Sequence, residues 1–213
     1  MRTRRSREVS CVALAVAVAL VGPGARAHAA APTAASRVLA ARMSATGRAE
    51  ATLLQRVPDP LGGPAAERRA RLALERPDRV RLDYEGGESV TLRRDGGEWL
   101  EPRLTQMLVF DSTGAGAAQR AWDLLLGRDD AIAEHPAGAG RWRLRPIRPD
   151  PALPDSVEIA LDAAGLPEQL VCWAGGERSV EFRISGWRFP RAKGRADFVL
   201  VAPHGYEVIP AGP

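Results

Sequence analysis

The sequence predicts a mainly β protein with helices, in which one long antiparallel sheet curves to bury an apolar face. Two observations carry this expectation. Apolar residues alternate with charged residues over much of the stretch 51–209, and short glycine-containing turns separate the alternating segments. Alternation with a period of two is typical of antiparallel strands that bury one face and expose the other. We expect about ten strands, joined in sequence by hairpins.

The clearest strands lie between residues 79 and 93. Val80, Leu82 and Tyr84 alternate with charged neighbours, and Val90 and Leu92 repeat the pattern. Glycines follow these segments, and glycine accepts the positive φ that tight hairpin turns require. We expect turns at 85–87, 95–97, 163–165 and 175–176, and the last two strands at Phe198 to Val201 and Tyr206 to Ile209.

Two segments depart from this pattern and have helical spacing instead. Residues 33–45 carry an apolar stripe at Val38, Leu39 and Met43, and residues 115–126 carry another that includes Trp122. A sheet of this length must curl to bury its apolar face. It can close as a barrel, or stay open with the helices on its concave side.

The first thirty residues resemble a cleavable secretion signal. Four arginines precede an apolar stretch from Cys11 to Val21, and Ala27 and Ala29 then form a small-residue cleavage pattern. An uncleaved membrane anchor is the alternative, but the stretch is about half of the roughly 20 residues that span a bilayer. No cysteine stands at the cleavage region to carry a lipid. We therefore expect residues 1–30 to be removed and residues 31–213 to form one soluble exported domain.

The charge balance argues against a nucleic-acid partner. The whole chain has 30 lysines and arginines against 26 acidic residues. Residues 1–30 contain five of the arginines and one acid, so 25 residues of each sign remain after cleavage. A nucleic-acid-binding protein needs a basic footprint, which a neutral chain lacks.

No motif in the chain predicts catalysis or a cofactor. Beyond residue 30 the histidines are His135 and His204, and neither has a second ligand at metal-binding spacing. Cys172 is the one cysteine there, so we expect neither a disulfide nor a cysteine-based metal site. Nucleophile elbows, phosphate loops and zinc-protease motifs are absent from the sequence. We expect a protein that is not an enzyme.

Several motifs, taken in order, resemble the LolA family of periplasmic lipoprotein carriers over nearly the whole mature length. They are the helix and its continuation at Val38 to Gln55, the segment LALERPDRVRLDY at Leu72 to Tyr84, the hairpin DGGEWLEP at Asp95 to Pro102, the leucine-rich WDLLLG at Trp122 to Gly127, and FVLVAPHGYEVI at Phe198 to Ile209. Each motif is weak alone. Their order, their spacing and the export signal together are specific.

This resemblance implies an open, strongly curved antiparallel half-barrel covered by a helical lid. Its concave face would hold acyl chains, and Arg76, directly before Pro77, would tether the lid in the empty form. Arg76 could instead be an ordinary solvated arginine. The expected cargo-facing residues are Leu74, Val80, Leu82, Tyr84, Val90, Leu92, Trp99, Trp122, Leu125, Leu126, Ile159 and Phe182.

The resemblance also implies a function. A monomeric periplasmic chaperone of this family shields the acyl chains of lipoproteins and moves them from the inner to the outer membrane. An inner-membrane ABC exporter loads it, and an outer-membrane acceptor unloads it. An envelope module of the same fold that senses lipid or binds a partner, without transport, is the alternative.

Overall fold

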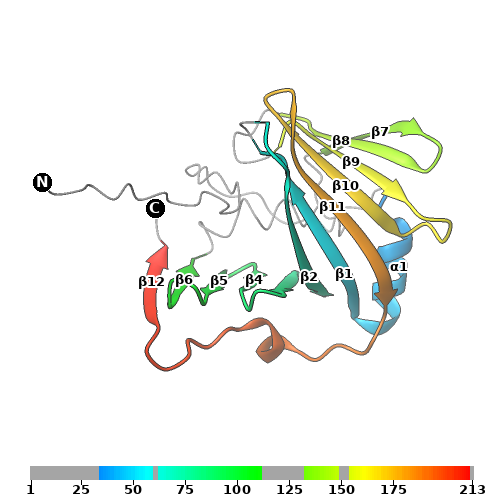
Figure 1. Cartoon of the computed structure of the whole chain (residues 1–213). Helices are drawn as coiled ribbons and strands as arrows, with labels where there is room; N and C mark the ends of the chain where they lie inside the picture. Colours follow the sequence, from blue (N-terminus) through cyan, green and yellow to red (C-terminus); the bar gives the residue numbers. More distant parts are fainter. Residues whose placement is uncertain (1–33, 60–61, 112–131, 149–153, 212–213) are drawn as a thin grey trace, which may run out of the picture.

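A twelve-stranded sheet dominates the computed structural model, which describes residues 34–59, 62–111, 132–148 and 154–211 (Figure 1). Within those ranges α1 is the one α-helix, and no helix is long and apolar enough to cross a membrane. The secretion signal and the helix expected at residues 115–126 lie outside the described residues. The elements are α1 (Arg37–Thr46), β1 (Arg48–Val57), β2 (Ala66–Glu75), β3 (Arg79–Tyr84), β4 (Ser89–Arg93), β5 (Gly96–Glu101), β6 (Gln106–Phe110), β7 (Ile132–Gly138), β8 (Arg141–Pro146), β9 (Ser156–Leu161), β10 (Pro167–Ala174), β11 (Glu177–Arg188), the 3-10 helix η1 (Arg195–Phe198) and β12 (Glu207–Ala211).

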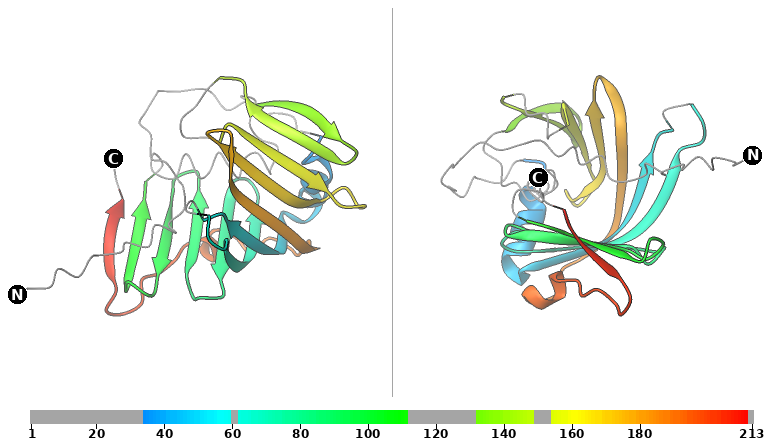
Figure 2. Two further views of the ribbon diagram at one scale, coloured as in Figure 1. Left: turned by 45° about the horizontal axis from the view of Figure 1, so that its top comes forward. Right: turned by 90° about the vertical axis from the view of Figure 1, so that its left-hand side faces the viewer.

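The strand order is β12-β6-β5-β4-β3-β2-β1-β11-β10-β9-β8-β7. Two runs of hairpins, β1 to β6 and β7 to β11, are therefore joined edge to edge by the pairing of β1 with β11. The expectation of one sequential run of hairpins was wrong in this respect. The strongly curved sheet is open, because its outer strands β12 and β7 do not pair with each other (Figure 2).

The period-two pattern is confirmed, and it separates two faces. On β2 and β3 the apolar partners Ala70 and Tyr84, Leu72 and Leu82, and Leu74 and Val80 face one side of the sheet. Leu39 and Met43 of α1 belong to the same buried cluster. Figure 2 shows α1 inside the curve of the sheet and η1 on the outer side. The apolar face is therefore the concave one.

The end of the chain differs from the expected pair of antiparallel strands. Residues 189–206, which we call the strap, run back across the convex face from β11 (Figure 1). The strand expected at Phe198 to Val201 is absent from the strap, where η1 ends at Phe198 and the next residues are unpaired with any strand. The strap crosses from β11 to the far edge of the sheet, where β12 pairs parallel with β6. The sheet is thus not wholly antiparallel.

A backbone bridge between Gly47 and Arg191 holds the start of the strap, and buried charges hold the rest of it. Both carboxylate oxygens of Glu75, which is 1% exposed, accept backbone N–H groups of the strap, from Lys193 at 2.8 Å and Gly194 at 3.0 Å. Arg48 and Arg79 donate to the same carboxylate at 3.3 and 2.7 Å. Burying a carboxylate is costly unless it is paired and hydrogen-bonded, and these four donors meet that need.

A second buried pair fastens the strap further along. Arg93 donates to the carbonyl of Phe198 at 2.5 Å, and Glu98 accepts the N–H of Leu200 at 3.3 Å. Burial opposes the ionisation of Glu98, but hydrogen bonds from Arg93 and Thr91 outweigh it and hold the pKa of Glu98 below its usual value. These side chains satisfy backbone groups that a strand ladder would otherwise pair, which explains why the strap needs no strand partner.

The Glu75 cluster predicts a large loss of stability when the carboxylate is removed. Glu75→Ala leaves two part-buried strap N–H groups and the buried Arg48 guanidinium short of an acceptor, and should lower the free energy of unfolding by about 3–5 kcal/mol. Glu67→Ala is the matched control, because Glu67 lies on the same strand but is exposed, with its carboxylate 3.7 Å from Arg56. It should cost less than about 1 kcal/mol. Urea unfolding measures both, and equal losses would contradict the assigned role of Glu75.

Candidate functional site: the concave apolar face

The structure brings together every predicted cargo-facing residue that it describes. Nine of the twelve lie in or against one hydrophobic cluster on the concave face. The buried members are Leu74, Val80, Leu82, Tyr84, Val90, Leu92 and Ile159, and the partly buried members are Trp99 and Phe182. Trp122, Leu125 and Leu126 lie outside the described residues. These residues lie on one side of the sheet, and most of their side chains are buried in this structure.

The face is wider than the sequence predicted. Its centre includes Leu53 of β1, which stands opposite Ile184 of β11 and Ala70 of β2. Leu144 and Val157 extend it onto β8 and β9, where they are direct cross-strand partners. The alternation marks these residues as the buried side of their own strands. It does not say which strands are neighbours, and so it could not assign them to one face.

A cluster of polar side chains lies at the end of the concave face that is farther from α1. The Tyr84 hydroxyl donates to Gln55 at 2.9 Å, and the Arg68 guanidinium lies 4.1 Å from the centre of the Tyr84 ring. Glu88 accepts the indole N–H of Trp99 at 3.0 Å and also contacts Arg68. Burial raises the pKa of Tyr84 to about 12, so the phenol stays neutral at physiological pH. Each of these polar groups is paired, so the face presents no unmatched charge to an apolar ligand.

Helix α1 lies at the other end of the face, where β1 begins. It ends at Gly47, whose φ of 81° is left-handed and whose N–H bonds to the carbonyl of Met43 at 2.7 Å. Just before the helix, Glu134 of β7 accepts the N–H groups of Ala34 and Ala35 at 2.7 and 2.8 Å. A carboxylate there satisfies free N–H groups and complements the positive end of the helix dipole. The helix is therefore tied to the edge strand of the sheet.

Arg76 lies in the turn between β2 and β3, beside the last turn of α1. Its side chain is exposed, and it donates to the Ser44 hydroxyl of α1 at 2.5 Å. Its backbone N–H bonds to the carbonyl of Gly47 at 2.9 Å. The predicted latch residue thus contacts a helix that covers the concave face. That helix is α1, whereas the leucine-rich segment beginning at Trp122 lies outside the described residues.

Comparison with solved structures finds similar chains at low sequence identity. No family model matches the sequence, and no curated protein matches it. An uncharacterized conserved protein from Thermus thermophilus is similar in structure at 13% identity, over 84% of this chain and 99% of the other, with a TM-score of 0.49. A LolA superfamily protein from Nitrosomonas europaea is similar at 8% identity, over 80% and 99%, with a TM-score of 0.43. A DUF1329 family protein from Desulfovibrio piger is similar at 9% identity, over 78% and 95%, with a TM-score of 0.43. These similarities concern the fold alone.

Helix α1 packs against the turn between β9 and β10, and substitutions in that turn can test this contact. Gly165 has a φ of 76°, and a Cβ atom there would lie 2.9 Å from Cγ2 of Val38. Gly176, with a φ of 80°, has open space at the same position. Both alanine substitutions cost roughly 1–2 kcal/mol because of the left-handed backbone. Gly165→Ala should cost about 1–3 kcal/mol more, because it also pushes against α1.

Denaturant unfolding of the two variants measures that difference directly. Adding Val38→Ala to Gly165→Ala removes the atom that clashes and should remove most of the excess cost, measured against Val38→Ala alone. If Gly165→Ala and Gly176→Ala are equally destabilised, α1 does not pack against this turn in solution.

Proposed function

We propose that this protein is a periplasmic carrier that shields the acyl chains of lipoproteins, or of similar lipids, against its concave apolar face. The observation that carries the proposal is the continuous apolar surface that β1 to β4 and β8 to β11 form on one side of an open sheet. The motif resemblance to LolA carriers supports the same role. An inner-membrane ABC exporter would load the carrier, and an outer-membrane acceptor would unload it.

The free energy that an acyl chain loses on leaving a membrane explains why a carrier needs such a face. Each buried methylene contributes about 0.8 kcal/mol, so a chain of about 14 methylenes loses on the order of 10 kcal/mol when it leaves a membrane. A soluble carrier must return most of this free energy through apolar contacts of its own. A face built from aliphatic side chains on many strands can do so without a specific polar contact, which suits cargo that differs in everything but its acyl chains.

Binding would require part of the packed interior to open. The concave side chains are buried in this structure, and Leu39 and Met43 of α1 supply part of the cover. A few polar contacts connect α1 to the sheet. Glu134 binds the residues just before the helix, and Arg76 binds Ser44 near its end. We infer that cargo displaces α1 from the concave face, and that these contacts set how readily it moves.

The proposal predicts that affinity follows acyl chain length. A hydrophobic fluorescent dye should bind the protein saturably, and N-acylated peptides should displace it. Lengthening the chain by two methylenes should raise affinity by up to roughly tenfold, given about 0.8 kcal/mol per buried methylene. The same peptide without its chain should not displace the dye.

Two matched variants locate the binding. Phe182→Ala, on the concave face, should weaken acyl binding, whereas Val208→Ala, exposed on the edge strand β12, should not. Displacement that is independent of chain length would rule out acyl recognition. Binding of acylated peptide without transfer to any acceptor would point to a lipid-sensing module in place of a carrier.

Arg76 is expected to act as a latch on α1. Arg76→Leu removes the hydrogen bond to Ser44, whose net worth at an exposed site is about 0.5–1.5 kcal/mol. The open form should therefore gain population by roughly two- to tenfold. Dye binding should increase by that factor, and release of acylated peptide to an acceptor should slow. Arg76→Lys should be intermediate, because an ammonium lacks the planar fork of a guanidinium.

Ser44→Ala removes the same contact from the helix side and supplies the control. If the contact is the latch, Ser44→Ala reproduces Arg76→Leu, and the double variant adds nothing further. Unchanged dye affinity and release in Arg76→Leu would show that Arg76 is a surface charge with no latch role.

A further inference from the structure

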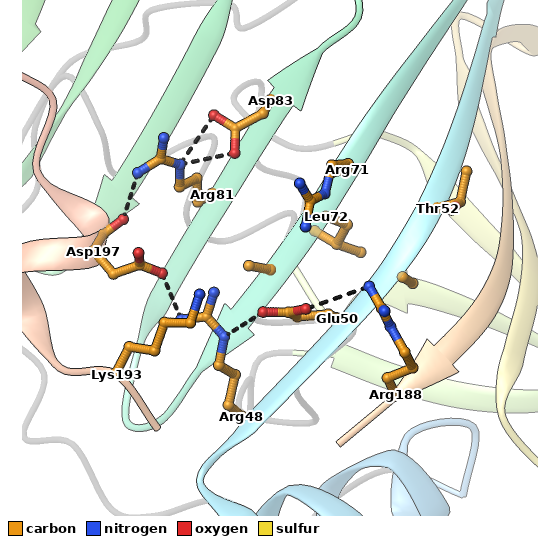
Figure 3. Close-up of a pocket in the computed structure, with 12 residues that line it drawn as sticks. Arg48, Glu50, Thr52, Arg71, Leu72, Arg81, Asp83, Arg188, Lys193 and Asp197 are labelled. Carbon is orange, nitrogen blue, oxygen red and sulfur yellow. Dashed lines mark hydrogen bonds and ion pairs between the residues drawn. The ribbon is translucent and has the colours of Figure 1, made fainter. Parts of the chain in front are cut away.

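The convex face carries a polar pocket that the acyl-binding role does not use. It lies between the outer side of β1, β2 and β3 and the strap (Figure 3). The pocket has a volume of about 210 Å³, below the roughly 300–1,000 Å³ of pockets for drug-sized ligands. That space suits one small polar group. The residues that form its charged walls are Arg48, Glu50, Arg71, Arg81, Asp83, Arg188, Lys193 and Asp197.

Strand register explains why a hollow exists there. Ala73 stands opposite Glu50 on β1 and opposite Arg81 on β3, and its strand neighbours on the same face are Arg71 and Glu75. Ala73 is thus a one-carbon side chain surrounded by long ones. The long side chains rise around it as walls, and Ala73 forms the floor. The strap closes one side, where Lys193 and Asp197 line the pocket.

The acids of the pocket are already matched by two of its arginines. Asp197 is 2.6 Å from Arg48, which also lies 2.9 Å from Glu50. Asp83 is 2.9 Å from Arg81 and accepts a hydrogen bond from Ser89 at 2.8 Å. Burial opposes the ionisation of Asp197, but Arg48 outweighs it and keeps the pKa of Asp197 below its usual value. Each of the three carboxylates therefore already has an arginine partner within the pocket.

The remaining cations are not matched in this way. Across the described residues, no hydrogen bond or ion pair reaches the Arg71 guanidinium, and Figure 3 shows it pointing toward the middle of the pocket. Arg188 reaches Glu50 only at 3.6 Å. Within the described ranges the Lys193 ammonium group also has no hydrogen bond, although it lies within electrostatic range of Asp197. Five cationic and three anionic side chains line the pocket, which leaves two positive charges in excess.

We propose that this pocket binds a phosphate group. A phosphate monoester carries about −1.5 to −2 charges at neutral pH, which neutralises an excess of two, whereas a carboxylate carries only one. Guanidinium forks match phosphate oxygens in a planar, two-point contact, and Arg71 has its fork free for this purpose. The site lies on the opposite side of the sheet from the concave face. The inference does not rest on the proposed carrier function.

The phosphate could come from a lipid headgroup or from a soluble phosphate ester. Calorimetric titration of the protein with inorganic phosphate should show saturable binding to one site. Acetate should bind roughly tenfold more weakly, because it lacks the second charge. Arg71→Gln should weaken phosphate binding by roughly tenfold or more, since a hydrogen bond to a charged group is lost. Ala73→Met should weaken it as well, by filling the floor while leaving every charge in place.

Arg69→Gln is the matched control. Arg69 is exposed on the same strand and the same face, two residues from Arg71 and outside the pocket, so its loss should change affinity by less than about twofold at moderate salt. Thermal unfolding of each variant shows that it is folded. No saturable phosphate binding, equal affinity for acetate, or equal losses in Arg69→Gln and Arg71→Gln would each overturn the proposal.

Vesicles identify the source of the phosphate. Cosedimentation with phosphatidylcholine vesicles that contain phosphatidic acid, lost in Arg71→Gln, would assign the site to a lipid headgroup. Saturable binding of inorganic phosphate without cosedimentation would assign it to a soluble phosphate ester.

Discussion

The pairing of β1 on both of its edges is the constraint on which the rest of the structure depends. One edge pairs with β2 from Arg48 to Val57, and the other pairs with β11 and joins the two runs of hairpins. The side-chain period of a strand is two, so a slip of one residue in either register would reverse every side chain of β1 relative to its neighbours. Leu53 would then leave the core, and Arg48 would enter it.

Both candidate sites follow from this register. The inward residues of β1 to β3 make the middle of the concave face, and the outward residues of the same strands make the Glu75 cluster and the polar pocket. Stability and binding are therefore divided between the two sides of one sheet. The concave side is largely apolar, and Arg68 and Glu88 at its end are paired with each other, which suits acyl chains. The convex side concentrates the charge and uses most of it to hold the strap.

The strap connects β11 to β12, and polar contacts hold it against the sheet. Glu75 and Glu98 accept its N–H groups, Arg93 donates to its carbonyl at Phe198, and Phe198 is itself fully buried beneath the Arg48 guanidinium, 5.3 Å from its ring centre. Buried charges of this kind contribute less to net stability than to the choice of one arrangement. Here they direct the chain across the convex face, so that β12 reaches the far edge of the sheet and pairs with β6.

Local sequence determined the strands, their turns and which side of each is apolar, because alternation and glycine at positive φ are properties of a few consecutive residues. It therefore predicted α1, most strands and the apolar side of each strand, whereas the expectation that these residues share one face came from the resemblance to a known family. Only the tertiary structure decided that β1 meets β11, that β12 runs parallel to β6, and that Phe198 belongs to a strap and not to a strand. Those outcomes depend on contacts between residues about a hundred positions apart, such as Arg93 with Phe198 and Leu200 with Glu98. No local pattern encodes them, because a buried carboxylate and an exposed one look the same in sequence until the chain that covers one of them is in place.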